Sequence, residues 1–70
     1  MFIYNKLRGR IIEKFGSMES FAETLGISSV SLSKKMNNKM GISREEIVRW
    51  AELLDISVDD YGAYFFAKEV

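Results

Sequence analysis

Residues Ser17 to Met36 read SMESFAETLGISSVSLSKKM, and their apolar side chains repeat as in two short helices separated by one glycine. In the first half, Phe21 and Leu25 lie four residues apart, a spacing that places both side chains on one face of a helix. Gly26 follows at once, and glycine is the residue that most easily adopts the left-handed conformation of a helix end. The run therefore predicts a helix, a tight turn and a second helix.

The second predicted helix has one apolar and one polar side. Leu32 and Met36 lie four residues apart and form the apolar stripe, and Ser28 just before the helix is a favoured N-cap residue. At 100° per residue, the opposite side carries Val30, Ser33, Lys34 and Asn37. Residues 17–37 thus form a helix-turn-helix unit, a scaffold that can present its second helix to the major groove of DNA.

The spacing within this unit resembles that of the Cro/cI-type (XRE-like) helix-turn-helix family. The matching residues are Ala22, Gly26 and Leu32, followed by KKMNNK at 34–39, which is similar to the segment after that family's recognition helix. The run YNKLRGRI from Tyr4 resembles the start of small temperate-phage regulators, which include Cro-like proteins and modulator-of-repression (MOR) proteins. The resemblance covers roughly residues 4–60 and implies an all-α, five-helix, lambda-repressor-like DNA-binding domain. Lys35 departs from the pattern, because many relatives carry an aliphatic residue there.

Three further helices are expected around this unit. The first begins near Asn5 as N-cap, and Ser43 with Glu46 forms a Ser-x-x-Glu capping box for a later one. The buried face of that later helix is predicted to comprise Ile47, Trp50, Ala51 and Leu54. Ser57 is expected to open a short last helix over residues 58–63. No repeat or linker is visible, so residues 1–70 are predicted to form a single domain.

Composition narrows the classes of function. The chain has 70 residues, of which 47% are hydrophobic and nine are aromatic, enough for one helical core. It contains no cysteine and no histidine, which removes the usual zinc ligands, general bases and thiol nucleophiles. We therefore expect neither an enzyme nor a cofactor. No apolar run is long enough to span a membrane and no signal peptide is recognisable, so we expect a cytoplasmic protein of a bacterial host.

The net charge is zero, although a basic surface is typical of DNA-binding proteins. Residues 1–40 hold seven basic and three acidic groups, a net of +4, whereas residues 41–70 hold three basic and seven acidic groups, a net of −4. A positive helix-turn-helix half and a negative C-terminal half is one interpretation. An ordinary solvated surface with a chance asymmetry is the other.

Residues Tyr61 to Phe66 contain four aromatic side chains in six positions. One interpretation is that this segment closes the core and pairs with the apolar arm Met1 to Tyr4. The other is an exposed apolar patch that marks a surface for self-association or for a partner. The resemblance favours a homodimer or a heteromeric contact through this C-terminal region.

Two groups of candidate site residues follow. Residues expected to face bases or a protein partner are Ser28, Ser29, Val30, Ser33, Lys34 and Asn37. Residues expected to contact phosphates are Ser17, Lys35, Asn38 and Lys39. Arg8 and Arg10 on the first helix either reach phosphates or simply solubilise an exposed face.

Two functions fit these residues. The first is a phage-type transcriptional regulator whose second helix of the unit binds operator DNA. The second is an antirepressor or modulator that binds a cI-type repressor through the same surface, a use that suits the small serines and the exposed apolar Val30. Neither function involves a membrane or a small-molecule substrate.

Overall fold

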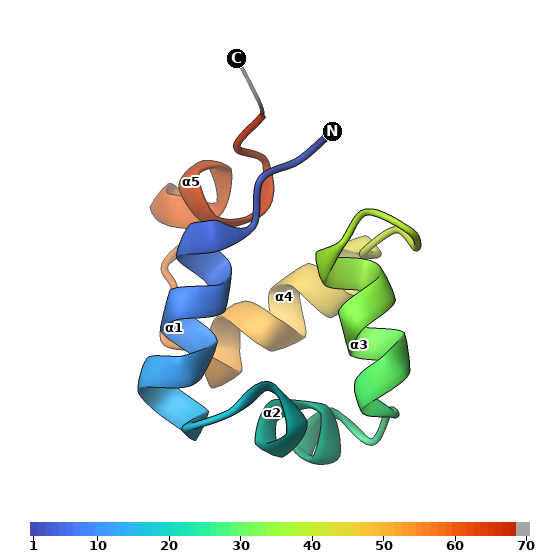
Figure 1. Cartoon of the computed structure of the whole chain (residues 1–70). Helices are drawn as coiled ribbons and strands as arrows, with labels where there is room; N and C mark the ends of the chain where they lie inside the picture. Colours follow the sequence, from blue (N-terminus) through green and yellow to red (C-terminus); the bar gives the residue numbers. More distant parts are fainter. Residues whose placement is uncertain (69–70) are drawn as a thin grey trace.

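Within residues 1–68, five α-helices and one 3-10 turn make up this all-α fold. The computed structural model describes residues 1–68. The elements are α1 (Asn5–Phe15), α2 (Met18–Leu25), α3 (Ser29–Met36), α4 (Arg44–Leu53), the 3-10 turn η1 (Val58–Asp60) and α5 (Tyr61–Phe65). Figure 1 shows α1 and α3 standing on opposite sides of α4, with α2 below them and α5 beside the start of α1. The five-helix architecture expected from the sequence is confirmed.

Serine residues begin three of the helices, as their positions predict. The Oγ atoms of Ser17, Ser28 and Ser43 each accept a hydrogen bond from the backbone N–H three residues later. At Ser43 the capping box is complete, because the Glu46 side chain also accepts a hydrogen bond from the Ser43 N–H at 2.9 Å. These caps satisfy N–H groups that have no partner within the first turn of a helix. The boundaries of the helix-turn-helix unit are therefore set locally.

Two predicted helix starts differ from the structure, one in its N-cap residue and one in the type of its first turn. The N-cap of α1 is Tyr4 rather than Asn5, and it makes no side-chain cap bond. The buried Tyr4 ring anchors this end of the helix instead. At the other end of the chain, Ser57 makes no cap bond to the backbone and donates its hydroxyl to Asp60 Oδ2 at 3.2 Å. The chain consequently forms a short 3-10 turn there before α5 begins at Tyr61.

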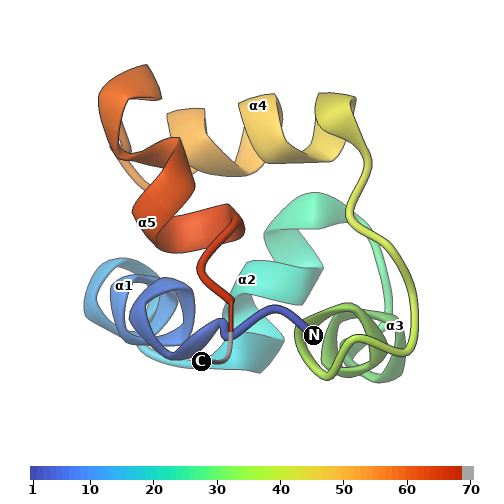
Figure 2. The same ribbon diagram turned by 90° about the horizontal axis from the view of Figure 1, so that it is seen from above.

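All five helices contribute buried side chains to one core, and Figure 2 shows their arrangement from above. Trp50 of α4 is buried, and its ring meets Phe21 of α2 edge to face with centroids 5.5 Å apart. The predicted α4 face is confirmed, because Ile47, Trp50, Ala51 and Leu54 are all buried. Met36 is also buried, whereas Met40 is exposed in the loop after α3.

The two ends of the described chain pair with each other. Phe2 forms an antiparallel β-bridge with Lys68, and the Ile3 N–H donates to the Ala67 carbonyl at 2.8 Å. Within the aromatic segment, Tyr64 and Phe65 are buried. Closure of the core is therefore confirmed for Tyr64 and Phe65, while the arm pairs with Ala67 and Lys68 just after this segment and Phe66 stays about half exposed.

Candidate nucleic-acid interface

The turn between α2 and α3 is built by Gly26. Its φ of 77° lies in the left-handed region, which glycine adopts without steric cost. This conformation lets the Ile27 N–H donate to the Ala22 carbonyl at 3.1 Å, a hydrogen bond typical of a helix end closed by a left-handed glycine. The chain then turns sharply into α3, where Leu32 is buried. The helix-turn-helix geometry thus follows from residues close together in the sequence.

The outer face of α3 is exposed along its whole length. Val30 retains 62% of its accessible surface, an unusual exposure for an aliphatic side chain. The other exposed residues on this face are Ser29, Ser33, Lys34 and Asn37. The Asn37 amide donates to Ser33 Oγ at 3.2 Å, so one turn of the face is already ordered by side chains. Five of the six residues expected to face bases or a partner therefore lie together on one free surface.

The sixth residue, Ser28, and the expected phosphate contact Ser17 are occupied as caps. Ser28 Oγ accepts from the Ser31 N–H at 3.0 Å and lies 3.1 Å from Ser31 Oγ. Ser17 Oγ accepts from the Ser20 N–H at 3.1 Å. Both hydroxyls have structural partners, so we assign both residues to the helix starts and not to direct contacts.

Lys35 is turned inward, although the sequence placed it among the phosphate contacts. Its Nζ lies 3.0 Å from Glu46 Oε2 and donates to the Gly41 carbonyl at 3.3 Å. Only 11% of the Lys35 side chain is exposed. The ammonium thus links α3 to the loop before α4 and to the first turn of α4. We leave Lys35 out of the proposed contact surface.

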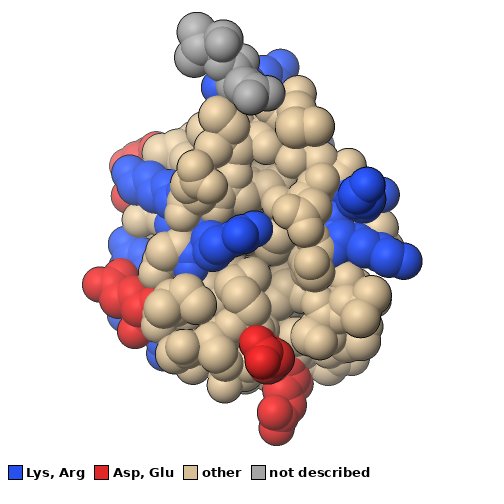
Figure 3. Space-filling view, viewed as in Figure 1, with Lys and Arg blue, Asp and Glu red and all other residues tan. Residues whose placement is uncertain are grey.

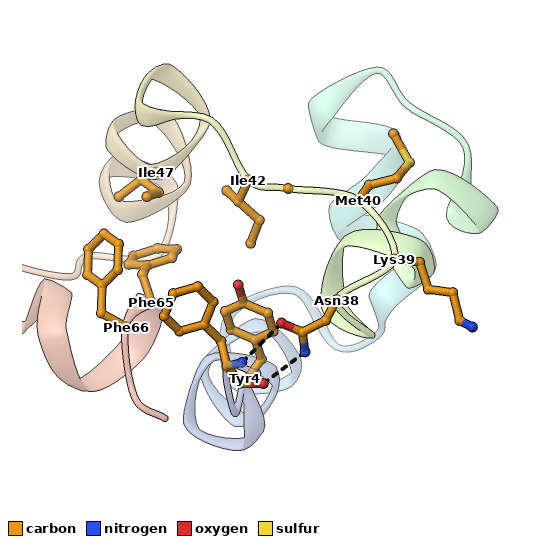
Figure 4. A pocket seen from close by; sticks show the side chains of 10 residues that line it. Tyr4, Asn38, Lys39, Met40, Ile42, Ile47, Phe65 and Phe66 are labelled. Carbon is orange, nitrogen blue, oxygen red and sulfur yellow. Dashed lines mark hydrogen bonds between the residues drawn. The ribbon is translucent and has the colours of Figure 1, made fainter. Parts of the chain in front are cut away.

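Asn38 is likewise committed to an internal contact. Its Nδ2 donates to the Phe2 carbonyl at 2.8 Å, and its Oδ1 accepts from the Phe2 N–H at 3.1 Å, shown as dashed lines in Figure 4. The Asn38 amide thereby bonds both backbone polar groups of Phe2, as a neighbouring β-strand would. No local pattern signals this contact, because 36 positions separate the two residues. Asn38 therefore holds the N-terminal arm against the loop after α3, and we no longer expect it to contact a phosphate.

A pocket of about 280 Å³ lies beside this contact, between the N-terminal arm, the loop after α3 and the last aromatic residues. In Figure 4, the side chain of Lys39 points away from the pocket, whereas Phe65 and Phe66 point toward it. Lys39 is exposed, and its backbone N–H donates to the Lys34 carbonyl at 2.8 Å. The Lys39 side chain is therefore free to meet a phosphate beyond the end of α3.

The charged groups are distributed unevenly around this surface. In Figure 3, Lys and Arg side chains flank α3 without acidic neighbours, whereas the acidic groups gather over α2 and at the outer side of α1. Among residues 1–68, the ion pairs are Arg10–Glu13, Lys14–Asp55 and Lys35–Glu46. Lys34 and Lys39 take part in none of these pairs. The positive charge beside α3 is therefore uncompensated locally.

A known protein family matches almost the whole chain. Residues 1–68 match the family described as "Protein of unknown function (DUF739)". The chain belongs to this family. No curated protein matches it. The match covers residues 1–68 of this DUF739 chain, from the N-terminal arm past the end of α5. It therefore includes both the helix-turn-helix unit and the segments that pair at the two ends of the described chain.

Within residues 1–68, no group of three or more side chains that could hold a metal ion comes together. Over the same residues, every helix is too short or too polar to cross a membrane.

Glu46 predicts a specific pH dependence of stability. Partial burial alone would raise the pKa of its carboxyl, but the hydrogen bonds from Ser43 and the Lys35 ammonium hold it below the ordinary value of 4.5. The folded state therefore binds this proton more weakly than the unfolded chain. Its contribution to stability is present above pH 4.5 and is lost as the pH falls through the lowered pKa.

We expect Glu46→Gln to make the free energy of unfolding less dependent on pH, because the amide cannot ionise. Urea unfolding at neutral pH and well below pH 4.5 measures this difference. Glu45→Gln is the matched control, since Glu45 is an exposed carboxylate in the same first turn and feels the same helix dipole. If Glu46→Gln kept the full pH dependence of the wild type, the stabilising role of this carboxylate would be refuted.

Proposed function

We propose that this chain is a small phage-type helix-turn-helix regulator that binds operator DNA through α3. The observation that carries the proposal is the free outer face of α3, held at the end of a tight glycine turn. Its serines are short enough for close approach to a groove, and a hydroxyl can both donate to and accept from base edges. Such a regulator of a lysis–lysogeny switch would act in the cytoplasm of its bacterial host.

The uncompensated lysines support the same proposal. Lys34 lies on the exposed face and Lys39 lies beyond its end, so both can neutralise phosphates while α3 occupies the groove. The acidic side chains of α2 limit how closely that helix approaches the backbone. We therefore place the DNA along α3 and the loop that follows it.

The test is selection from a random duplex library by the purified protein, followed by titration of the selected duplex at several salt concentrations. Saturable, sequence-specific binding that weakens with salt is the expected result. Absence of any selected sequence would contradict DNA binding by this protein alone.

A second candidate function is binding to a cI-type repressor protein. The exposed Val30 near the start of α3 favours it, because apolar side chains are typical of the centre of a protein interface. The first turn of α3 also lacks the Arg, Asn or Gln side chains that make bidentate base contacts. Co-purification of this chain with a tagged repressor from the same phage switch, and loss of that repressor's operator binding, are the corresponding test.

Either function is compatible with a homodimer through the C-terminal region. Val48 and Phe66 are large exposed hydrophobic residues beside an apolar groove between α4 and α5. A symmetric dimer would present two α3 helices to two half-sites of one operator. Sedimentation equilibrium of the purified chain checks the oligomeric state.

Adjacent lysines provide a sharp prediction about α3. We expect Lys34→Ala to weaken binding of the selected duplex and to reduce the slope of log K against log salt by about 0.9, the value for one phosphate contact. Lys35→Met is the neighbouring control, because its ammonium is held by Glu46. It should leave the slope unchanged, provided that circular dichroism shows both variants to be folded. The opposite pattern would mean that α3 is rotated relative to the proposed orientation.

A further inference from the structure

The structure has a shallow polar hollow between the N-terminal arm, the first turns of α1 and the end of α3. Its lining includes Arg8 of α1 and Asn37 at the end of α3. Asn38 forms one wall, and its two hydrogen bonds to Phe2 hold the arm against the loop after α3. The contact between Asn38 and Phe2 therefore fixes the position of the hollow.

The basic residues of α1 differ in what they contact. Lys6 Nζ lies 5.0 Å from the centre of the Tyr64 ring, on the side of the helix next to α5. Arg10 donates to Tyr64 Oη at 3.0 Å, a hydrogen bond that raises the pKa of its guanidinium, and lies 3.8 Å from Glu13. Arg8 is exposed, and among residues 1–68 it has no ion pair and no side-chain hydrogen bond. The two arginines therefore differ in role: Arg10 is held by contacts within the fold, whereas the Arg8 guanidinium is free to bind a phosphate.

Arg8 has the chemistry and the position for a phosphate. A guanidinium presents paired donors that match two phosphate oxygens. A helix in the major groove, about 12 Å wide, has a sugar–phosphate strand on each side. Figure 3 shows basic side chains on both sides of the largely uncharged surface between α1 and α3. The lining of the hollow includes both Arg8 and Asn37, the last residue of the exposed face of α3.

We propose that Arg8, at the hollow between α1 and the end of α3, binds a backbone phosphate of the DNA duplex occupied by α3. This inference rests on the proposed DNA-binding function and extends the interface from the helix-turn-helix unit to α1. Contacts of this kind fix the register of a protein on the duplex without reading its sequence. The Asn38–Phe2 contact supports this role of Arg8 indirectly, because it holds the shape of the hollow that Arg8 lines.

The test compares variants on the selected duplex between about 50 and 200 mM salt. Arg8→Ala should reduce the salt slope by about 0.9, so that its affinity falls roughly 3.5-fold less than that of the wild type over this fourfold rise in salt. Arg8→Lys should keep the slope, because it keeps the charge. Lys6→Ala is the matched control on the same helix, since it removes one charge beside Tyr64, and it should change neither slope nor sequence preference.

Asn38→Gly tests the hollow itself. Asn38 has a φ of 61°, which glycine adopts freely, so the variant removes the amide without straining the backbone. We expect faster hydrogen exchange at the Phe2 amide and a DNA affinity reduced in the same direction as in Arg8→Ala. An unchanged slope in Arg8→Ala, with a reduced slope in Lys34→Ala, would overturn this proposal while DNA binding through α3 stands. Failure of the wild type to bind any duplex would overturn both.

Discussion

Trp50→Ala is expected to lower the free energy of unfolding by about 3–5 kcal/mol. Trp50 is only 1% exposed and packs edge to face against Phe21 at the centre of the core. Truncating a buried tryptophan costs about 3–5 kcal/mol, because apolar contacts are lost and a cavity remains. A domain of 70 residues has a total stability of roughly 3.5–10 kcal/mol. The substitution therefore removes a large share of the stability, and at the low end of that range nearly all of it.

Thermal unfolding followed by circular dichroism measures this effect. Phe66→Ala is the aromatic control, because Phe66 is 49% exposed and its ring pairs with that of Phe2. Its loss should cost about 1 kcal/mol, from partial burial and one aromatic pair. A Trp50→Ala variant that melted cooperatively near the wild-type temperature would show that the core is not organised around this residue.

The helices of this protein are predictable because their signals are local. Gly26 ends α2 and Ser28 begins α3, and each acts through hydrogen bonds to residues five or fewer positions away. The capping box of Ser43 and Glu46 spans only three positions. A pattern read within one or two turns is therefore sufficient to place these elements.

The contacts that complete the site are not local. Lys35 reaches Glu46 eleven positions away, and Asn38 reaches Phe2 across 36. Both side chains are polar, and each directly follows an exposed residue in the sequence, Lys34 and Asn37 respectively. The sequence pattern alone therefore groups all four residues together. Only the fold shows that two of these four residues are used internally. The same limit applies to Arg8 and Arg10, which look alike in sequence, although Arg10 donates to Tyr64 Oη and Arg8 lines the hollow beside the N-terminal arm.

Val30→Asp is expected to abolish the main interaction of this protein without unfolding it. Val30 is 62% exposed at the second position of α3, where an acidic side chain is favoured by the helix dipole. The fold should therefore be preserved. A carboxylate facing phosphates, or buried in the centre of a protein interface, costs several kcal/mol, so affinity should fall at least about a hundredfold.

The matched control is Val58→Asp, which places the same charge on another exposed valine, 73% accessible, in the turn η1. It should leave binding of the selected duplex and of the repressor unchanged. A Val30→Asp variant that retained both interactions would show that the start of α3 lies outside the interface. Retention of DNA binding by Val58→Asp together with its loss in Val30→Asp would locate the interface on α3.

The salt dependence of the Val30→Asp defect distinguishes the two proposed partners. If α3 faces DNA, the defect is repulsion between the carboxylate and phosphates, and screening by salt should narrow the gap between variant and wild type. If α3 inserts Val30 into an apolar pocket of a repressor, the defect is the cost of burying an ion. Salt does not relieve that cost, so the gap should stay constant. Val30→Ala separates the two further, because it weakens a hydrophobic contact with the repressor but adds no charge to repel DNA.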